Sequence, residues 1–175
     1  GTDAEGPTVN TLDGDPAFSV YKETIDEQIS AELTTDNFFE IAKGYPFGIA
    51  RIGGENIVRD PFEVTSQGGL SCFGDVPEGE FVHILEGKPE SLIDAAKMAK
   101  EEAHDGTQTT DTVFFFDCIS RVLYLQEEFD SELARVEPDD AELFGALTIG
   151  EIANDGTGHL DYYNKTAVVA AVRRL

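Results

Sequence analysis

Four polar residues that could do chemistry follow directly on one apolar stretch of the sequence. The run Val113–Phe116 is unbroken and rich in aromatic side chains, which is typical of a strand buried on both faces. An acid, a thiol, a hydroxyl and a guanidinium then follow at Asp117, Cys118, Ser120 and Arg121. Because ligands tend to bind where the strands of such sheets end, the pattern predicts a ligand site here.

Two other interpretations of these residues stay open at this point. Asp117 and Ser120 can simply cap the helix that follows, while Arg121 pairs with a surface acid. Cys118 as a catalytic nucleophile needs a lowered pKa and a general base, for which the three histidines of the chain are poorly placed. A buried structural thiol is favoured for Cys118, and a cysteine-nucleophile enzyme is the alternative.

Two further polar residues are predicted to join this site. Glu151 emerges just after a predicted strand, 143–149, and Asn164 lies near the start of the last predicted strand. If 143–149 runs parallel to the central strand, the polar residues that follow both strands share one rim of the sheet. We expect Arg121 to bind a ligand carboxylate, Glu151 to bind an ammonium group and Asn164 to fix the orientation, as would suit an amino acid. The predicted ligand-binding set is Cys118, Ser120, Arg121, Glu151 and Asn164.

Signatures of cofactor chemistry are weak in this sequence. It contains no P-loop, no dinucleotide-binding fingerprint, no serine nucleophile elbow and no CxxC pair, so we expect no cofactor and no structural zinc. Glu151, His159 and Asp161 are possible metal ligands, but their spread across a glycine loop is weak support and no metal is predicted. Cys72 and Cys118 are expected to be free and buried.

Hydrophobic periodicity predicts the elements that must position these residues. Helices are predicted at 16–29, 89–104 and 122–136, with a shorter helix beginning near Thr35. Short strands between 47 and 85 are predicted to form an antiparallel meander with a turn at Gly53-Gly54, and later strands are expected at 143–149 and 162–172. The order predicts a single domain of the mixed α/β (α+β) class, with a largely antiparallel sheet flanked by helices. Residues 1–7 are predicted to be a flexible lead-in and 8–175 to form the domain.

The charge is the most unusual feature of the composition. Thirty-five Asp and Glu stand against 12 Lys and Arg in 175 residues, which gives a net charge of −23, and the acids are dispersed along the chain. Such a field repels phosphate backbones and anionic lipid, so nucleic acid and membrane surfaces are not expected partners. The chain is 41% hydrophobic, which is enough to build a core. Dispersed acid together with such a core predicts a protein adapted to high salt, where screening removes the self-repulsion.

The ends and the hydropathy of the chain bear on its location. No apolar run approaches the roughly 20 residues that span a bilayer, and no signal segment precedes the acidic start. We therefore expect a soluble cytoplasmic protein. The chain begins at Gly1 without an initiator Met, which predicts either processing or a segment of a longer protein.

Six short motifs, in order, resemble those of the FIST C domain, which is the C-terminal half of the FIST sensory module. They run from about Asp13 to the end of the chain. The motifs are D-G-x-P-A-x-x-x-Y (13–21), G-Y-P-F-G-I (44–49), I-V-R-D-P (57–61), F-D-C-I-S-R (116–121), G-E-I (150–152) and Y-N-K-T (163–166). The resemblance implies a non-enzymatic sensory domain for small ligands, such as an amino acid or a carboxylate, in a signal-transduction protein. Its implied partners are the FIST N domain or a signalling output domain.

Two departures from the family pattern carry expectations of their own. The usual N-terminal half is not in this chain, so a site shared between the halves would be incomplete here. Ala146 stands where the family often has an aromatic residue, which would change the wall of any pocket at that point.

A third interpretation of the chain's function is a docking module whose exposed β edge binds a partner or the N-terminal half.

Overall fold

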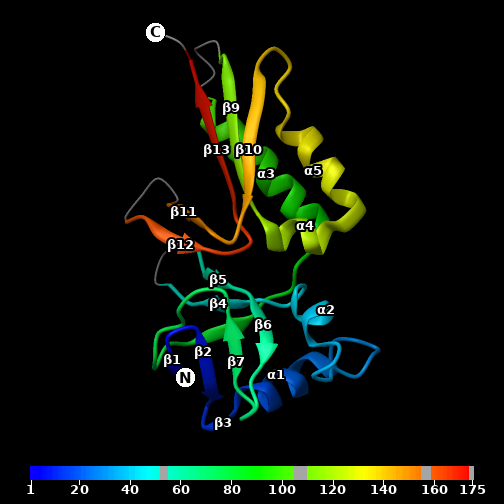
Figure 1. Ribbon diagram of the computed structural model, residues 1–175, viewed down its shortest axis with the longest axis vertical. Coiled ribbons are helices and arrows are strands. Elements are labelled where there is room, and N and C mark those ends of the chain that lie inside the picture. The colour runs from blue at the N-terminus through cyan, green and yellow to red at the C-terminus, as the bar shows by residue number, and fades with distance from the viewer. Residues whose placement is uncertain (52–54, 105–109, 155–158, 174–175) are drawn as a thin grey trace. The chain divides into compact units, whose positions relative to one another are not determined.

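Two compact units, Gly1–Glu86 and Gly87–Leu175, make up the computed structural model (Figure 1). The structure describes residues 1–51, 55–104, 110–154 and 159–173. Helices and several mostly antiparallel sheets are both present, so the predicted mixed α+β class is confirmed. No composition shift or linker in the sequence indicates this division. Within the described ranges, no helix is long and apolar enough to cross a bilayer.

The first unit packs two helices with two antiparallel sheets. One sheet has the order β1-β2-β7-β6, with β3 paired to β2, and the other has the order β5-β4-β8. Its core includes an aromatic group in which the Tyr21 ring lies 5.6 Å from both Phe38 and Phe47. The elements are β1 (Thr2–Glu5), β2 (Thr8–Leu12), β3 (Asp15–Pro16), α1 (Ala17–Asp26), α2 (Phe38–Ala42), β4 (Phe47–Ile49), β5 (Ile57–Arg59), β6 (Pro61–Val64), β7 (Leu70–Cys72) and β8 (Val82–Ile84).

The start of the chain is a strand and not an irregular lead-in. β1 pairs antiparallel with β2, and Thr2 is buried with its hydroxyl donating to the Pro77 carbonyl at 2.8 Å. A short polar segment carries little hydrophobic signal, so its pairing with β2 was not visible in the sequence. The turn predicted at Gly53-Gly54 lies outside the described residues.

The second unit carries the predicted site. Its sheet has the order β10-β9-β13, in which β10 runs parallel and β13 antiparallel to β9. Helices α3 and α5 lie along one face of this sheet (Figure 1), and Ala96, Val113, Phe115 and Val136 form the core between them. The elements are α3 (Pro89–Ala103), β9 (Thr112–Cys118), α4 (Ile119–Leu125), η1 (Gln126–Glu128), α5 (Phe129–Val136), β10 (Glu142–Thr148), β11 (Glu151–Ala153), β12 (Asp161–Tyr163) and β13 (Ala167–Val172).

Three expectations about this unit are corrected. The helix predicted at 122–136 starts earlier and is divided, since Gln126 has a φ of +52° between α4 and α5. The strand predicted at 162–172 is two strands, β12 and β13, separated at Lys165 with a φ of +55°. The central strand is covered on one face only, because Phe116 remains 40% exposed. Val113–Phe116 is apolar at every position, so the sequence does not alternate and gives no sign that one face is exposed. The two backbone turns likewise leave no trace in hydrophobic periodicity.

Candidate functional site

The five predicted ligand-binding residues come together at one end of the central strand. β10 is the parallel neighbour of β9, as the shared rim requires, and β13 begins opposite the end of β9 with Ala167 paired to Asp117. The expected open rim is instead a buried cluster, because each of the five side chains is at most 8% exposed. These residues are Cys118, Ser120, Arg121, Glu151 and Asn164.

Arg121 contacts four groups of its own unit. Its Nε lies 2.9 Å from Asp117 Oδ1, and its Nη2 pairs with Glu132. Nη2 also donates to the Leu92 carbonyl at 2.8 Å, and Nη1 donates to the Lys165 carbonyl at 3.4 Å. The guanidinium therefore joins β9, α3, α5 and the turn before β13, and its acidic partners are buried, not on the surface.

Glu132 is a member of this cluster that was not predicted from the sequence. It is fully buried on α5. The signal was present in the sequence, because position 132 falls on the same helical stripe as Phe129, Leu133 and Val136. An acid on an apolar stripe requires a buried partner, and here that partner is Arg121.

The cluster carries more acid than base. Asp117 and Glu132 both face the single guanidinium of Arg121, and all three side chains are at most 2% exposed. Burial raises the pKa of Asp117 to about 8, since it outweighs the opposing effect of Arg121, and the charges of Glu132 and Glu151 raise the pKa further. These effects favour the protonated form of Asp117 more than in an ordinary aspartate.

Glu151 and Cys118 lie beside Asp117 and Arg121, and burial favours the uncharged form of both side chains. Thr148 Oγ1 donates to Glu151 Oε1 at 2.5 Å, but burial still raises the pKa of Glu151 to about 7. Ser120 Oγ donates to Cys118 Sγ at 3.2 Å. Burial also raises the pKa of the Cys118 thiol, which is the reverse of what a thiolate nucleophile requires. Both cysteines of the chain are free and buried, as expected.

Gly150 gives the turn before Glu151 its shape. Its φ is +107°, and a Cβ at this position would lie 2.3 Å from the Tyr162 hydroxyl. That hydroxyl donates to the Ile149 carbonyl and accepts from Asn164 Nδ2 at 3.4 Å. The close backbone approach expected of this glycine is present, and its neighbour is a tyrosine ring.

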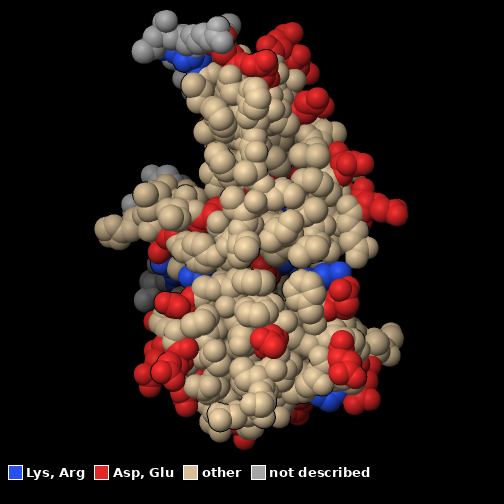
Figure 2. All heavy atoms as spheres, viewed as in Figure 1, with Lys and Arg blue, Asp and Glu red and all other residues tan. Residues whose placement is uncertain are grey.

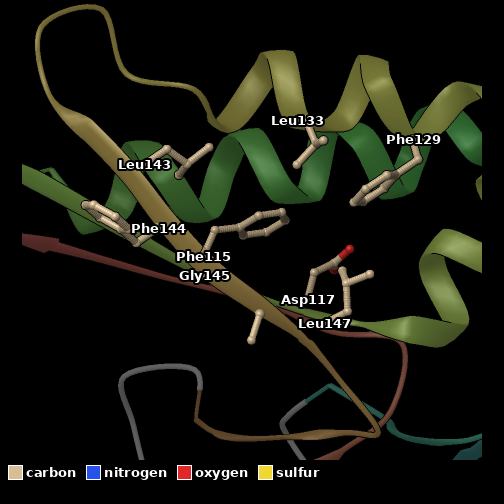
Figure 3. A pocket seen from close by; sticks show the side chains of 9 residues that line it. Phe115, Asp117, Phe129, Leu133, Leu143, Phe144, Gly145 and Leu147 are labelled. Atoms are coloured by element: carbon tan, nitrogen blue, oxygen red, sulfur yellow. The ribbon is translucent and has the colours of Figure 1, made fainter.

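A pocket of about 340 Å³ lies on the helix-covered face of the sheet (Figure 3). Its walls come from β9, β10 and α5 and are mainly apolar, and Asp117 is the one ionisable residue among the described lining. Figure 3 shows the Asp117 carboxyl beneath the rings of Phe115 and Phe129, with Leu147 beside it. The lining residues are Phe115, Asp117, Phe129, Leu133, Leu143, Phe144, Gly145, Ala146 and Leu147.

This pocket is not predicted by the sequence patterns, although two of its residues stand out in them. Asp117 was assigned to the polar rim, and Ala146 was identified as a small residue in a possible pocket wall. The adjacent Gly145 marks a place where β10 and β9 approach closely, because a Cβ there would lie 1.8 Å from the Phe115 carbonyl oxygen. Small residues in the middle of a strand indicate a close backbone approach.

The possible metal ligands do not assemble. Ala153 is the residue that pairs with Asp161 across the β11–β12 hairpin, whereas Glu151 pairs with Tyr163. Within the described ranges, no group of three or more His, Cys, Asp or Glu side chains is arranged to hold a metal ion.

Comparison with known proteins identifies one family. The FIST C domain profile matches residues 17–154, which is well over half of the chain. The match contains four of the six motifs in full, whereas the first extends before it and Y-N-K-T (163–166) lies beyond it. A comparison with proteins of curated function finds no match.

Proposed function

Because the chain belongs to the FIST C domain family, whose members are sensory domains of signal transduction, we propose that it senses a small ligand. We propose further that the pocket formed by β9, β10 and α5 is the ligand site.

The observation that carries this proposal is the pocket itself. Its volume of about 340 Å³ falls within the range of roughly 300–1,000 Å³ that is usual for small-molecule sites. Apolar walls with one polar group are also usual for such sites, because the apolar surface supplies affinity and the polar group fixes orientation. Asp117 is that polar group here.

None of the five residues predicted from sequence is in the described lining of this pocket, and we propose that Arg121 acts on it through Asp117. Arg121 pairs with Asp117 directly, and Cys118 and Ser120 follow it in the chain. The finer expectation is an amino-acid ligand whose carboxylate is held by Arg121 and whose ammonium is held by Glu151. Since the described contacts of the guanidinium are all internal, a ligand carboxylate would have to displace Asp117 or Glu132.

A thermal-shift screen of the chain in molar salt tests the proposed site. Amino acids, small amines and small carboxylates are compared, because a ligand that binds only the folded state raises the melting temperature. Leu147→Trp places a large side chain at the pocket, and Leu123→Trp is the matched control on α4, outside the lining. Both leucines are nearly half exposed, at 49% and 42%, so both variants should fold.

The expected result is a compound that raises the melting temperature of the native chain and of Leu123→Trp but not of Leu147→Trp. If every active compound stabilises Leu147→Trp equally, the ligand site is elsewhere. If no compound has an effect, the sensory proposal for this chain alone fails.

A second candidate function is the docking module, with the N-terminal FIST half as the partner. The observation that favours it is the other face of β9 and β10, where the Phe114 ring lies 6.4 Å from both Phe116 and Phe144. Phe144 is 52% exposed and Phe116 is 40% exposed. Gel filtration with a separately expressed N-terminal half should show a complex that Phe116→Ser weakens.

A cysteine enzyme is less well supported because Cys118 is buried with a raised pKa.

A further inference from the structure

We propose that the pocket selects organic cations, in which a small apolar body fills the cavity and an ammonium group pairs with Asp117. This inference rests on the proposed function, because it names the ligand class of the same pocket.

The first argument is the balance of charge in the buried cluster. Arg121 contributes one positive charge, whereas Asp117 and Glu132 contribute two negative charges when both are ionised. Glu151 adds a further buried carboxyl nearby. An uncompensated charge inside a protein is strongly unfavourable. One guanidinium thus faces three carboxyls, so the cluster needs additional positive charge, which bound protons or a cationic ligand supply.

The second argument is the position of Asp117 between the cluster and the pocket. Its carboxyl is the ionisable group in the described lining, and both of its oxygens are buried. Arg121 and Glu132 approach this carboxyl from the side of the cluster. Leu147 is its partner in the parallel register and lies beside it (Figure 3). Because Asp117 is fully covered, a ligand reaches its carboxyl only after a neighbouring side chain moves, and we propose that this side chain is Leu147.

The third argument is the chemistry of the walls. The rings of Phe115 and Phe129 line the same pocket as the carboxyl (Figure 3), and aromatic faces attract ammonium groups. Among the nine residues described in the lining, none is basic, so a carboxylate ligand would meet apolar walls and a carboxyl group. An amine without a carboxylate therefore fits this pocket better than a free amino acid does.

Cation binding at this site is coupled to the release of a proton. In the empty pocket the proton resides on the acidic cluster, where Asp117 faces Arg121 from α4, Glu132 from α5 and Glu151 from β11. An ammonium group that binds replaces this proton, and the charge of the cluster is unchanged. Affinity should rise with pH up to about 8, the pKa of Asp117, while alkylammonium groups, with a pKa of about 10.4 in lysine, stay charged.

The experiment compares three probes of similar shape by calorimetry in molar salt. Phenethylamine is the cation, 2-phenylethanol is the neutral analogue and 3-phenylpropanoate is the anion. We expect the amine to bind roughly 10-fold or more tightly than the alcohol, because a hydrogen bond to a charged group is worth more than a neutral one. Between pH 6 and pH 8 its affinity should increase by up to about 10-fold per pH unit, with about one proton released.

Two Asp→Asn variants test the role of the carboxyl. Asp117→Asn has the shape of the protonated acid, so it should fold and lose both the preference for the amine and the pH dependence. Asp130→Asn, at an exposed position on α5, is the control and should behave as the native chain does. If Asp117→Asn does not fold, calorimetry of the native chain in buffers of different ionisation enthalpy still measures the number of protons released when the amine binds. Release of no proton would contradict the proposal.

The possible failures can be told apart. Equal binding of amine and alcohol, with both abolished in Leu147→Trp, would overturn the cation preference and leave the proposed site intact. Binding of the amine that Leu147→Trp does not affect would overturn the proposed site as well. Tighter binding of the anion than of the amine would reverse the assigned charge of the ligand.

Discussion

Arg121 Nε lies 2.9 Å from Asp117 Oδ1, and neither side chain is more than 2% exposed. The two residues are four positions apart, on either side of the junction at which β9 becomes α4. Within the described residues, no side chain caps the N-terminus of α4. The ion pair therefore fixes the direction in which the chain leaves the central strand, and Glu132 extends it to α5.

Arg121→Ala should destabilise the chain strongly. The change leaves Asp117 and Glu132 buried without their cation, and removing one partner of a buried pair typically costs about 3–5 kcal/mol. Protonation of Asp117 would limit the loss, so the loss should be larger at pH 8 than at pH 5. Urea unfolding in molar salt measures the effect. Arg135→Ala, on the exposed side of α5, is the control, with an expected change within about 0.5 kcal/mol. Equal stabilities of the two variants would show that the buried pair contributes nothing.

The stability of the chain should fall as the pH rises through neutrality. The folded-state pKa values are about 8 for Asp117 and about 7 for Glu151, above the ordinary values of 3.8 and 4.5 for these carboxyl groups. The folded state thus binds more protons than the unfolded state between about pH 4 and pH 8, and this contribution is lost as the pH rises across that window. The urea midpoint should be lower at pH 8.5 than at pH 6, where surface acids are already ionised. Asp117→Asn should make this dependence weaker, and an unchanged slope in this variant would contradict the assignment.

Gly150→Ala should disturb the turn that carries Glu151. The φ of +107° is unfavourable for alanine, and the new Cβ would meet the Tyr162 hydroxyl at 2.3 Å. We expect a loss of more than about 1 kcal/mol in the free energy of unfolding. Gly14→Ala is the matched control, because Gly14 has a φ of +92° and a Cβ added there would have nothing within 4 Å. The difference between the variants isolates the contact with Tyr162, and a larger loss for Gly14→Ala would refute its importance.

The acidic surface should make the fold depend on salt. Asp and Glu side chains are spread over the face seen in Figure 2, where Lys and Arg are few, and the net charge is −23. Salt shortens the screening length from about 10 Å at 0.1 M to about 3 Å at 1 M, which reduces the repulsion among these acids. Thermal unfolding in a KCl series should therefore show a melting temperature that rises with salt. If screening is the cause, NaCl should raise the melting temperature as much as KCl does. A melting temperature that does not change with either salt would refute salt adaptation.

Local sequence patterns were enough to predict most elements of this chain and the residues that gather at the site. The amphipathic pattern of Pro89–Ala103 predicts α3, since its apolar face recurs at helical spacing. The apolar run of β9 and the polar residues that follow it predict the place of the cluster, because the end of a buried strand fixes where the next residues emerge. The motifs also indicate the FIST C family, which the profile match supports.

The construction of the site, in contrast, depends on packing between elements that are distant in the chain. Burial turned a predicted rim into a core cluster, because Glu132 arrives from α5 and surrounds Arg121 with a second acid. The cavity also depends on the distance between β10 and α5, which no local pattern encodes. Hydrophobic periodicity records which face of an element is apolar, but the partner that covers that face is chosen by packing. For this reason Asp117, first assigned to the rim, proved to connect the charged cluster to the pocket.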